Sequence, residues 1–92
     1  MACEEITWDE GAEQHIARHG VNAEEVEEVL HGVTVQLGAP LTRLLVLGRT
    51  LAGRYLVVVL EALTKAGDLC RVVTARDMTE SERRLYRRRT RA

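Results

Sequence analysis

The spacing of apolar residues changes several times along the chain, and each change marks a predicted element. Residues 5–8 (EITW) form a short run with β-forming residues, which predicts a strand. Ala12 and Ile16 then lie four residues apart, which predicts a first helix. Asp9 is suited to cap the start of this helix, and Gly20 is suited to end it.

A second helix is predicted to follow almost directly. Asn22, with Glu25 three residues later, has the pattern of a capping box. One face of this helix is apolar and the other is acidic, the apolar positions being Val26, Val29 and Leu30. Gly32 ends the pattern. Because only HGVN joins the two helices, we expect them to form a bent pair or hairpin.

From residue 33 the apolar period becomes two, which is typical of strands. Residues 33–37 alternate, and residues 44–48, 54–63 and 69–76 are further β-rich runs separated by short turns. The last three runs predict an antiparallel meander. The run YLVVVL at 55–60 does not alternate, so we expect a central strand covered on both sides.

The chain is predicted to end in a helix. Thr79 and Glu82 form a capping box, and the helix should run from about residue 80 towards 90. The expected order is therefore β-α-α-β-β-β-β-α, an α+β fold with a mostly antiparallel, twisted sheet. The N-terminal helix pair and the arginine-rich C-terminal helix pack on this sheet. We expect a single domain over 1–92, with a core at about 5–88 and a frayed tail at 89–92.

Charge is distributed unevenly along this chain, although its formal net charge is only -1. Nine acidic residues and a single arginine, Arg18, precede residue 37, whereas twelve basic and five acidic residues follow it. Eight arginines lie between residues 71 and 91. Such asymmetry points to nucleic acid or an acidic protein as a partner.

Composition indicates the expected compartment. Hydrophobic residues make up 46% and charged residues 29% of the chain, and no apolar run approaches the roughly 18 residues of a membrane span. The opening MACEEITWDE has neither the basic start nor the apolar core of a signal peptide. We therefore expect a cytoplasmic protein without membrane association, in which Cys3 and Cys70 are reduced thiols.

Two arginines of the last predicted strand and its exit are candidates for phosphate binding. Strict alternation places Arg71 on one face, and Arg76 with Cys70 on the other. A charge in mid-strand needs water, a ligand or a carboxylate, so Arg71 either contacts a ligand or pairs with Glu61 of the neighbouring strand. Arg76, at the start of the final turn, either binds phosphate or pairs with Asp77.

The other candidates are a tyrosine and two histidines. Tyr86 lies among arginines, where it either stacks on a base or packs between helix and sheet. His15 and His19 share a helix face at the i, i+4 spacing of some zinc sites, but no HExxH motif or third ligand accompanies them. We therefore predict no metal site.

Three stretches together resemble the BrnT family of toxins from type II toxin-antitoxin systems, which are small proteins of the RelE-like ribonuclease fold. They are WDEGAEQHIARHGVNAEEVEEVL, VLGRTLAGRYLVVVLE and CRVVTARDMTESERRLYRR, and they span about residues 6–88. The sequence departs from the family where BrnT-like chains carry a lysine early in the first helix and K-H-G at its end. Here these positions are Ala12 and R-H-G.

The resemblance implies an RNA endonuclease that inhibits translation, uses neither metal nor cofactor, and is covered by a cognate antitoxin protein. It implies that two arginines stabilise the charge that develops on the scissile phosphate, namely Arg71 and Arg76. It implies three candidates for proton transfer, namely Tyr86, Glu61 and His19. The predicted RNA-binding residues are arginines of the GRTLAGR hairpin and the final helix, namely Arg49, Arg54, Arg83, Arg84 and Arg87.

Two other hypotheses remain open. In the first, the same arginines hold RNA or an acidic protein without any cleavage, so that the domain is a binding module. In the second, the acidic helix pair of one copy binds the basic helix of another, giving a homodimer through complementary charge.

Overall fold

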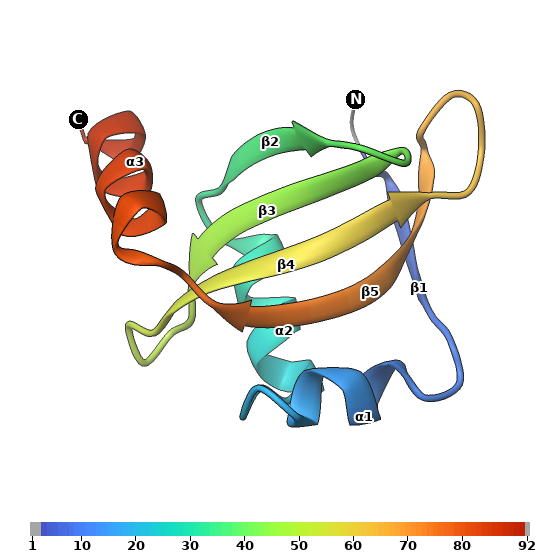
Figure 1. The fold of residues 1–92 in the computed structure, drawn as a ribbon, viewed down its shortest axis with the longest axis horizontal. Coiled ribbons are helices and arrows are strands. Elements are labelled where there is room, and N and C mark those ends of the chain that lie inside the picture. The colour runs from blue at the N-terminus through green and yellow to red at the C-terminus, as the bar shows by residue number, and fades with distance from the viewer. Residues whose placement is uncertain (1–2, 92) are drawn as a thin grey trace.

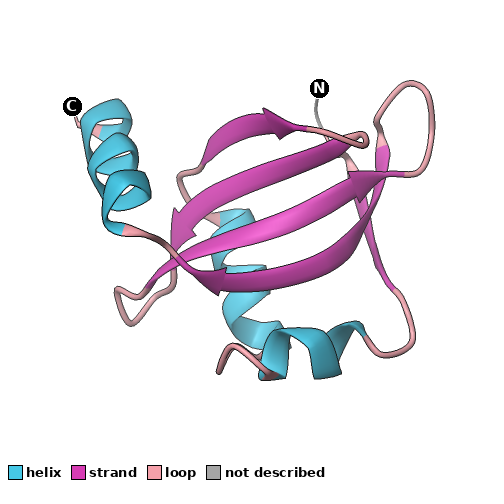
Figure 2. Ribbon diagram, viewed as in Figure 1, coloured by secondary structure: helices cyan, strands magenta, loops and turns pink. Residues whose placement is uncertain are grey.

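The computed structural model describes residues 3–91, and its element order is the one predicted from the sequence (Figures 1 and 2). The elements are β1 (Glu5–Trp8), α1 (Ala12–Ala17), α2 (Ala23–His31), β2 (Val35–Ala39), β3 (Arg43–Arg49), β4 (Tyr55–Ala62), β5 (Leu69–Asp77) and α3 (Glu80–Thr90). The α+β class is confirmed. The final helix extends to Thr90, two residues into the predicted tail, and residue 92 lies outside the described residues.

The five strands form one mixed sheet in the order β1-β5-β4-β3-β2. Strands β2 to β5 pair in antiparallel fashion, which confirms the meander, and β1 pairs in parallel with β5 at one edge. The central strand is β4, and its residues 56–60 are buried, as the lack of alternation predicts. Strands β3 and β5 pair with its two edges, and its side chains join the core cluster on each face of the sheet.

The helices divide between the two faces of the sheet (Figure 1). Helices α1 and α2 pack on one face, where Ile16, Val26 and Val29 join the aliphatic side chains of β3, β4 and β5 in a buried core. Helix α3 contributes Tyr86 to a second cluster on the opposite face. It covers only one end of that face, which we call the open face (Figure 2). The rest of the open face is available to a partner.

The helix starts are partly those predicted. The capping boxes Asn22–Glu25 and Thr79–Glu82 are both present, with reciprocal side-chain to backbone hydrogen bonds. The predicted cap of the first helix by Asp9 is wrong, because Gly11 occupies that position and no side chain caps the helix. The carboxylate of Asp9 instead accepts a hydrogen bond from Arg71 at 2.8 Å. A strong charge-assisted bond has replaced a local cap.

Strand β5 does not alternate strictly, and this changes which face its arginines occupy. The β4–β5 register shifts at Val59/Leu60, so that Leu60 is opposite Val72 and Val59 is opposite Thr74. Because a bulge inserts one extra residue, the side-chain phase reverses beyond it. Arg71 and Arg76 therefore lie on the same open face, and the prediction of opposite faces is wrong.

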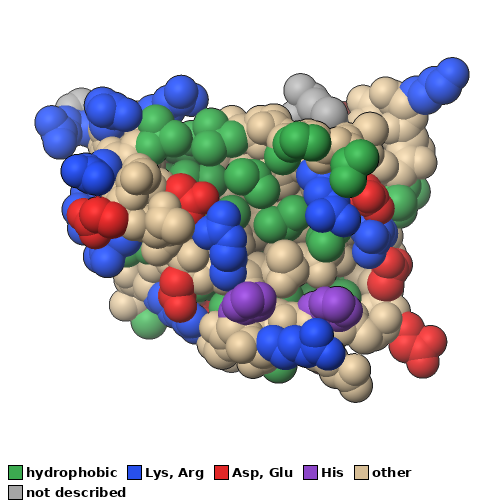
Figure 3. Space-filling model, viewed as in Figure 1, with side chains coloured by type: hydrophobic (Ala, Val, Ile, Leu, Met, Phe, Trp, Pro, Cys, Tyr) green, Lys and Arg blue, Asp and Glu red, His purple; other side chains and the backbone are tan. Residues whose placement is uncertain are grey.

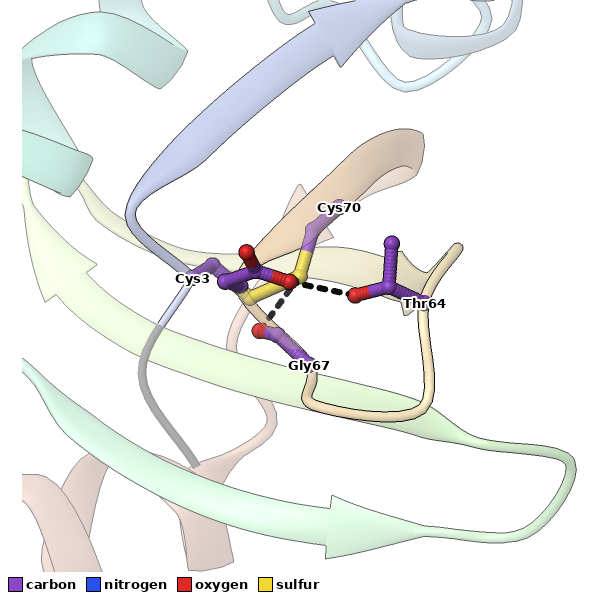
Figure 4. The surroundings of a disulfide bond; sticks show 5 residues. Cys3, Thr64, Gly67 and Cys70 are labelled. Atoms are coloured by element: carbon purple, nitrogen blue, oxygen red, sulfur yellow. Dashed lines mark hydrogen bonds between the residues drawn. A yellow bond between two sulfur atoms is a disulfide. The ribbon is translucent and has the colours of Figure 1, made fainter.

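The two cysteines form a disulfide, which contradicts the prediction of reduced thiols. The sulfur atoms of Cys3 and Cys70 are 2.07 Å apart, and 67 residues separate them in sequence. The bond joins the segment before β1 to the buried start of β5, beside the turn that contains Thr64 and Gly67 (Figure 4). Composition gave no sign of this bond, because it depends on the parallel pairing of β1 with β5.

Within residues 3–91, no helix combines the length and the hydropathy that crossing a bilayer demands.

Candidate functional site

Positive charge gathers where α3 meets the open face. Figure 3 shows this face, with Lys and Arg side chains crowded over α3 and hydrophobic side chains spread over the neighbouring strands. The arginines at this end come from two elements: Arg49 ends β3, whereas Arg83 and Arg87 are one turn apart on α3. Residues four positions apart share a helix face, so the two α3 arginines point the same way.

Tyr55 lies at the centre of these arginines. The guanidinium carbons of Arg49 and Arg83 are each 4.7 Å from the centre of its ring, and that of Arg87 is 5.2 Å away. The Arg87 Nε atom also donates a 3.4 Å hydrogen bond to the Tyr55 hydroxyl. Cation-π contacts of this kind hold a guanidinium over an aromatic ring without neutralising its charge. We call Arg49, Arg83 and Arg87 the arginine cluster.

The arginine cluster has no acidic partner in the part of the chain that the structure describes. No carboxylate oxygen of residues 3–91 lies within 4.0 Å of a side-chain nitrogen of its three members. Four other arginines do have such a partner, namely Arg43, Arg54, Arg71 and Arg76. The chain therefore separates structural arginines from a group whose charge remains free for a ligand.

The β3–β4 hairpin positions Arg49. Arg49 and Tyr55 are opposite each other in the register, and the turn between them contains Gly53 at φ 92°. A Cβ atom at Gly53 would come within 2.9 Å of the Arg49 Nη2 atom. Glycine is favoured here by its positive φ, and any larger residue would also displace the Arg49 guanidinium.

Arg76 and Glu82 fix the start of α3. Arg76 donates from both terminal nitrogens to the two carboxylate oxygens of Glu82, at 2.8 and 3.0 Å. Glu82 also accepts from the backbone N–H of Thr79 in the capping box. The hydrogen bond from Arg76, together with that from Thr79, lowers the pKa of Glu82 to about 2, against the opposing effect of burial. The Arg76 guanidinium is therefore engaged inside the fold.

Tyr86 fixes the second turn of α3. Its ring is 6% exposed, and its hydroxyl donates a 2.8 Å hydrogen bond to the carbonyl oxygen of Val33. Burial raises the pKa of Tyr86. The ring also meets Tyr55 edge to face, with centroids 6.0 Å apart. Tyr86 therefore packs between helix and sheet, which is one of the two interpretations that the sequence left open.

Arg54 joins several elements behind the cluster. It donates to both carboxylate oxygens of Asp77, at 2.9 and 3.2 Å, and it contacts both Glu25 oxygens at 3.3 Å. It also donates to the carbonyl oxygens of His19 and Gly20. Arg54 thus links the helix pair to the ends of β4 and β5.

Arg71 and Glu61 form a separate group at the other end of the open face. The Arg71 Nε atom donates to Glu61 at 2.7 Å, so the ion pair considered from the sequence is present. Arg43 lies 3.9 Å from the same carboxylate. Tyr55 and Glu61 are six residues apart on β4, a span of about 20 Å at about 3.3 Å per residue. One phosphate group cannot contact both ends.

The five predicted catalytic residues are therefore not gathered at one point. Arg71 and Glu61 are paired at one end, Arg76 and Tyr86 lie under α3 at the other, and His19 is exposed near Asp77. Three of the five predicted RNA-binding arginines lie together, namely Arg49, Arg83 and Arg87 of the arginine cluster. Arg54 is ion-paired, and Arg84 is exposed on α3. Residues 3–91 contain no group of three or more His, Cys, Asp and Glu side chains that could hold a metal ion.

Sequence reasoning missed Tyr55. The expected hairpin would have placed Tyr55 opposite Arg49, since RTLAGRY is a short turn flanked by strands. Nothing in the sequence indicated that Arg83 and Arg87 would reach the same ring, because this depends on where α3 docks.

A hollow of about 310 Å³ borders the cluster and is lined by Gly53, Arg54, Tyr55, Asp77, Met78 and Arg83. Its wall carries guanidinium donors and a phenol hydroxyl. Planar guanidinium groups are suited to bind phosphate oxygens through two parallel hydrogen bonds, and a hydroxyl can exchange a proton with a bound group. The geometry thus combines an anion site with a group that can transfer a proton.

Comparisons with known proteins bear on the identity of the chain. The family model described as "Ribonuclease toxin, BrnT, of type II toxin-antitoxin system" matches residues 8–82, which include Tyr55 but end just before Arg83. No curated protein matches the chain. The fold is similar to a crystal structure of the Brucella abortus ribonuclease toxin BrnT, with a TM-score of 0.63 and 23% identity over 83% of this chain and 97% of that chain. The resemblance noted in the sequence is confirmed, and the chain belongs to the BrnT family of ribonuclease toxins of type II toxin-antitoxin systems.

Proposed function

We propose that this toxin cleaves RNA without a metal ion and thereby stops translation, with the scissile phosphate bound by the arginine cluster. The observation that carries this proposal is the arrangement of three guanidinium groups around Tyr55 with no acidic partner among the described residues. An arginine already bound to a carboxylate is a poor phosphate ligand. These three are free to act.

The chemistry of RNA supports metal independence. The 2′-hydroxyl next to each phosphodiester is an internal nucleophile, so no metal-activated water is needed for the first step. Negative charge grows on the phosphate oxygens as the 2′-oxygen attacks. Fixed guanidinium donors stabilise this charge more strongly in the transition state than in the ground state, which is the condition for catalysis.

This proposal changes the roles of the residues that the sequence predicted to be catalytic. Arg76 and Tyr86 act as positioning residues, because they hold α3 where Arg83 and Arg87 reach Tyr55. Glu61 lies too far along β4 from Tyr55 to contact the same phosphate, and Arg71 of β5 is paired with it. Asp9 and Glu61 already neutralise the Arg71 charge, so this proposal gives the pair no role in binding the phosphate.

A direct assay tests the proposal. The purified toxin is incubated with cellular RNA and EDTA, and the ends of the products are mapped. We expect cleavage that leaves 2′,3′-cyclic phosphate and 5′-hydroxyl ends, inhibition of a cell-free translation reaction, and a loss of about 100-fold or more in Arg83→Ala. Arg18→Ala is the matched control, because Arg18 is exposed on the side of the acidic helix pair.

Two results would overturn the proposal. Cleavage that stops with EDTA and returns with Mg²⁺ would exclude metal independence. Salt-dependent RNA binding with no products would favour the alternative, a binding module of the same fold.

Family membership implies a protein antitoxin, and the open face supports a proposal for where it binds. Partly buried apolar residues lie on the same open face, farther along the strands from the arginine cluster, namely Leu37, Leu45 and Val73. A partner that combines apolar and acidic side chains would cover both features and block access to RNA. In the competing hypothesis, the acidic residues of α2 in one copy bind the arginines of α3 in another and form a homodimer. Sedimentation of the toxin alone tests this, because such a homodimer should dissociate at high salt.

A further inference from the structure

Tyr55 occupies a position that few surface tyrosines have. It begins β4 on the open face, at the rim of the 310 Å³ hollow, and it is partly exposed. Arg49 approaches from the adjacent strand, and Arg83 and Arg87 approach from α3. Two elements, β3 and α3, thus bring three guanidinium groups to one phenol ring.

The surroundings of the ring limit what Tyr55 can do. Three guanidinium groups lie over the ring at 4.7 to 5.2 Å, and Tyr86 packs against it at an interplanar angle of 80°. These neighbours occupy the space that a stacked base would need. The hydroxyl is therefore the part of Tyr55 that meets a ligand, and its described hydrogen bond is the 3.4 Å one donated by Arg87.

The electrostatics favour the ionised form of this hydroxyl. The hydrogen bond from Arg87 lowers the pKa of Tyr55, the charges of Arg49, Arg87 and Arg83 lower it further, and desolvation only partly opposes them. No carboxylate oxygen of residues 3–91 lies within 4.0 Å of a side-chain nitrogen of the cluster, although the charge of Glu80 acts on Arg87 from farther away. The pKa values of the two tyrosines are thus shifted in opposite directions, because burial raises that of Tyr86.

We propose that Tyr55 is a catalytic residue that accepts the proton of the attacking 2′-hydroxyl when RNA is cleaved. This inference rests on the proposed function and names the proton acceptor of that site. A phosphate bound by the arginine cluster lies beside the phenol oxygen, because the cluster surrounds the same ring. The adjoining 2′-hydroxyl is then within reach of that oxygen.

Cleavage exchanges one phosphorus–oxygen bond for another and moves one proton at each end. The Tyr55 phenolate takes the proton from the 2′-hydroxyl, the 2′-oxygen forms a bond to phosphorus, and the bond from phosphorus to the 5′-oxygen breaks. The 5′-oxygen leaves with a proton from water, and Tyr55 returns its proton to solvent. The products are a 2′,3′-cyclic phosphate and a 5′-hydroxyl, with no redox change.

The arginines and carboxylates near the hollow are poorer proton acceptors. Arg54 and Arg76 are held protonated, because the hydrogen bonds that they donate to their carboxylate partners raise their pKa values. Glu82 is saturated by Arg76 and Thr79. Asp77 is bound by Arg54, whose hydrogen bond lowers the Asp77 pKa and makes this carboxylate a weaker base. Tyr55 has no such permanent acidic partner.

The test is the pH dependence of cleavage by Tyr55→Phe, measured with a short RNA that the parent cleaves. The parent rate should rise with pH until Tyr55 is ionised, and Tyr55→Phe should lose this rise together with about 100-fold or more of the rate. Arg87→Ala should move the inflection to higher pH, because the hydrogen bond that stabilises the phenolate is gone. Circular dichroism checks the fold of Tyr55→Phe, which removes only one hydroxyl.

A substrate with a 5′-sulfur leaving group separates the two proton-transfer roles. Sulfur leaves without needing a proton, so this substrate rescues the loss of a general acid but not of a general base. We expect no rescue of Tyr55→Phe. Rescue to the parent rate would show that Tyr55 protonates the leaving group, and it would overturn the proposal.

The remaining outcomes distinguish this inference from the proposed function. If the parent cleaves RNA and Tyr55→Phe has an unchanged rate and pH profile, the role of Tyr55 is wrong while the ribonuclease stands. If the parent leaves RNA intact under all conditions, the proposed function itself fails. Spectroscopic titration adds an independent check, since Tyr55→Phe should abolish the lower of the two tyrosine transitions.

Discussion

Arg76 binds Glu82 through both terminal nitrogens, and this ion pair joins the end of β5 to the first turn of α3. The pair fixes the start of the helix that carries two members of the arginine cluster. Its effect on function is therefore indirect, because a shift of α3 would move Arg83 and Arg87 away from Tyr55.

The Arg76–Glu82 pair should make stability depend on acid pH. Because the pKa of Glu82 falls from 4.5 to about 2 in the folded state, its contribution is present above about pH 4.5 and is lost as pH falls towards 2. We expect Glu82→Gln to cost about 2 kcal/mol at pH 7 and to flatten the acid limb of the unfolding free energy. Urea titrations at several pH values measure this. Glu80→Gln, at an exposed position on the same turn, is the control and should keep the parent's slope.

Tyr86 should matter for stability more than for chemistry. Tyr86→Phe leaves the Val33 carbonyl without its 2.8 Å hydrogen bond, which should cost about 1 kcal/mol of unfolding free energy. The cleavage rate should fall by less than about tenfold, because the ring still seats α3. A loss as large as that of Tyr55→Phe would restore Tyr86 as a candidate for proton transfer.

Gly53 should control the position of Arg49. In Gly53→Ala the new methyl group meets the Arg49 guanidinium and the residue must keep φ near 92°, so we expect about 1 kcal/mol of destabilisation and several-fold weaker RNA binding. Gly38→Ala is the matched control, since no atom lies within 4 Å of a Cβ there. Equal RNA affinity in both variants would show that Arg49 does not contribute to RNA binding.

The disulfide should stabilise the fold under oxidising conditions. Closing a chain segment of 67 residues restricts the unfolded state by up to about 4 kcal/mol in the chain-entropy treatment. We expect Cys3→Ser to melt well below the oxidised parent and close to the reduced parent. Thermal unfolding with and without reductant, together with a thiol count, makes the comparison. A parent with the same melting temperature in both states would remove any stabilising role for the bond.

Salt should distinguish free arginines from paired ones. The slope of log affinity against log salt for uncleavable 2′-O-methyl RNA should fall by about 0.7 in Arg87→Ala, because one phosphate contact is lost. Arg71→Ala should leave the slope nearly unchanged, since Glu61 and Asp9 already neutralise that charge. The reverse result would place the RNA at the other end of the open face.

The chain's local patterns determined the element order and two of the helix starts. The capping boxes at Asn22 and Thr79 depend on residues three positions apart, and the uninterrupted run at 55–60 could only be satisfied in a central strand. The resemblance to the BrnT family could also be recognised from the sequence, because the three stretches that carry it keep their order and spacing over most of the chain. Interactions over a few residues leave a direct mark in sequence.

Tertiary structure decided which arginines are free. A bulge in β5 placed Arg71 and Arg76 on one face, and carboxylates of the neighbouring elements β4 and α3 then engaged them. The docking of α3 brought Arg83 and Arg87 to Tyr55, and the pairing of β1 with β5 brought Cys3 to Cys70. Each of these contacts joins residues of different segments of the fold, so its partner is set by packing. The sequence alone determined that positive charge would collect near the C-terminus, whereas only the fold decided where that charge is available.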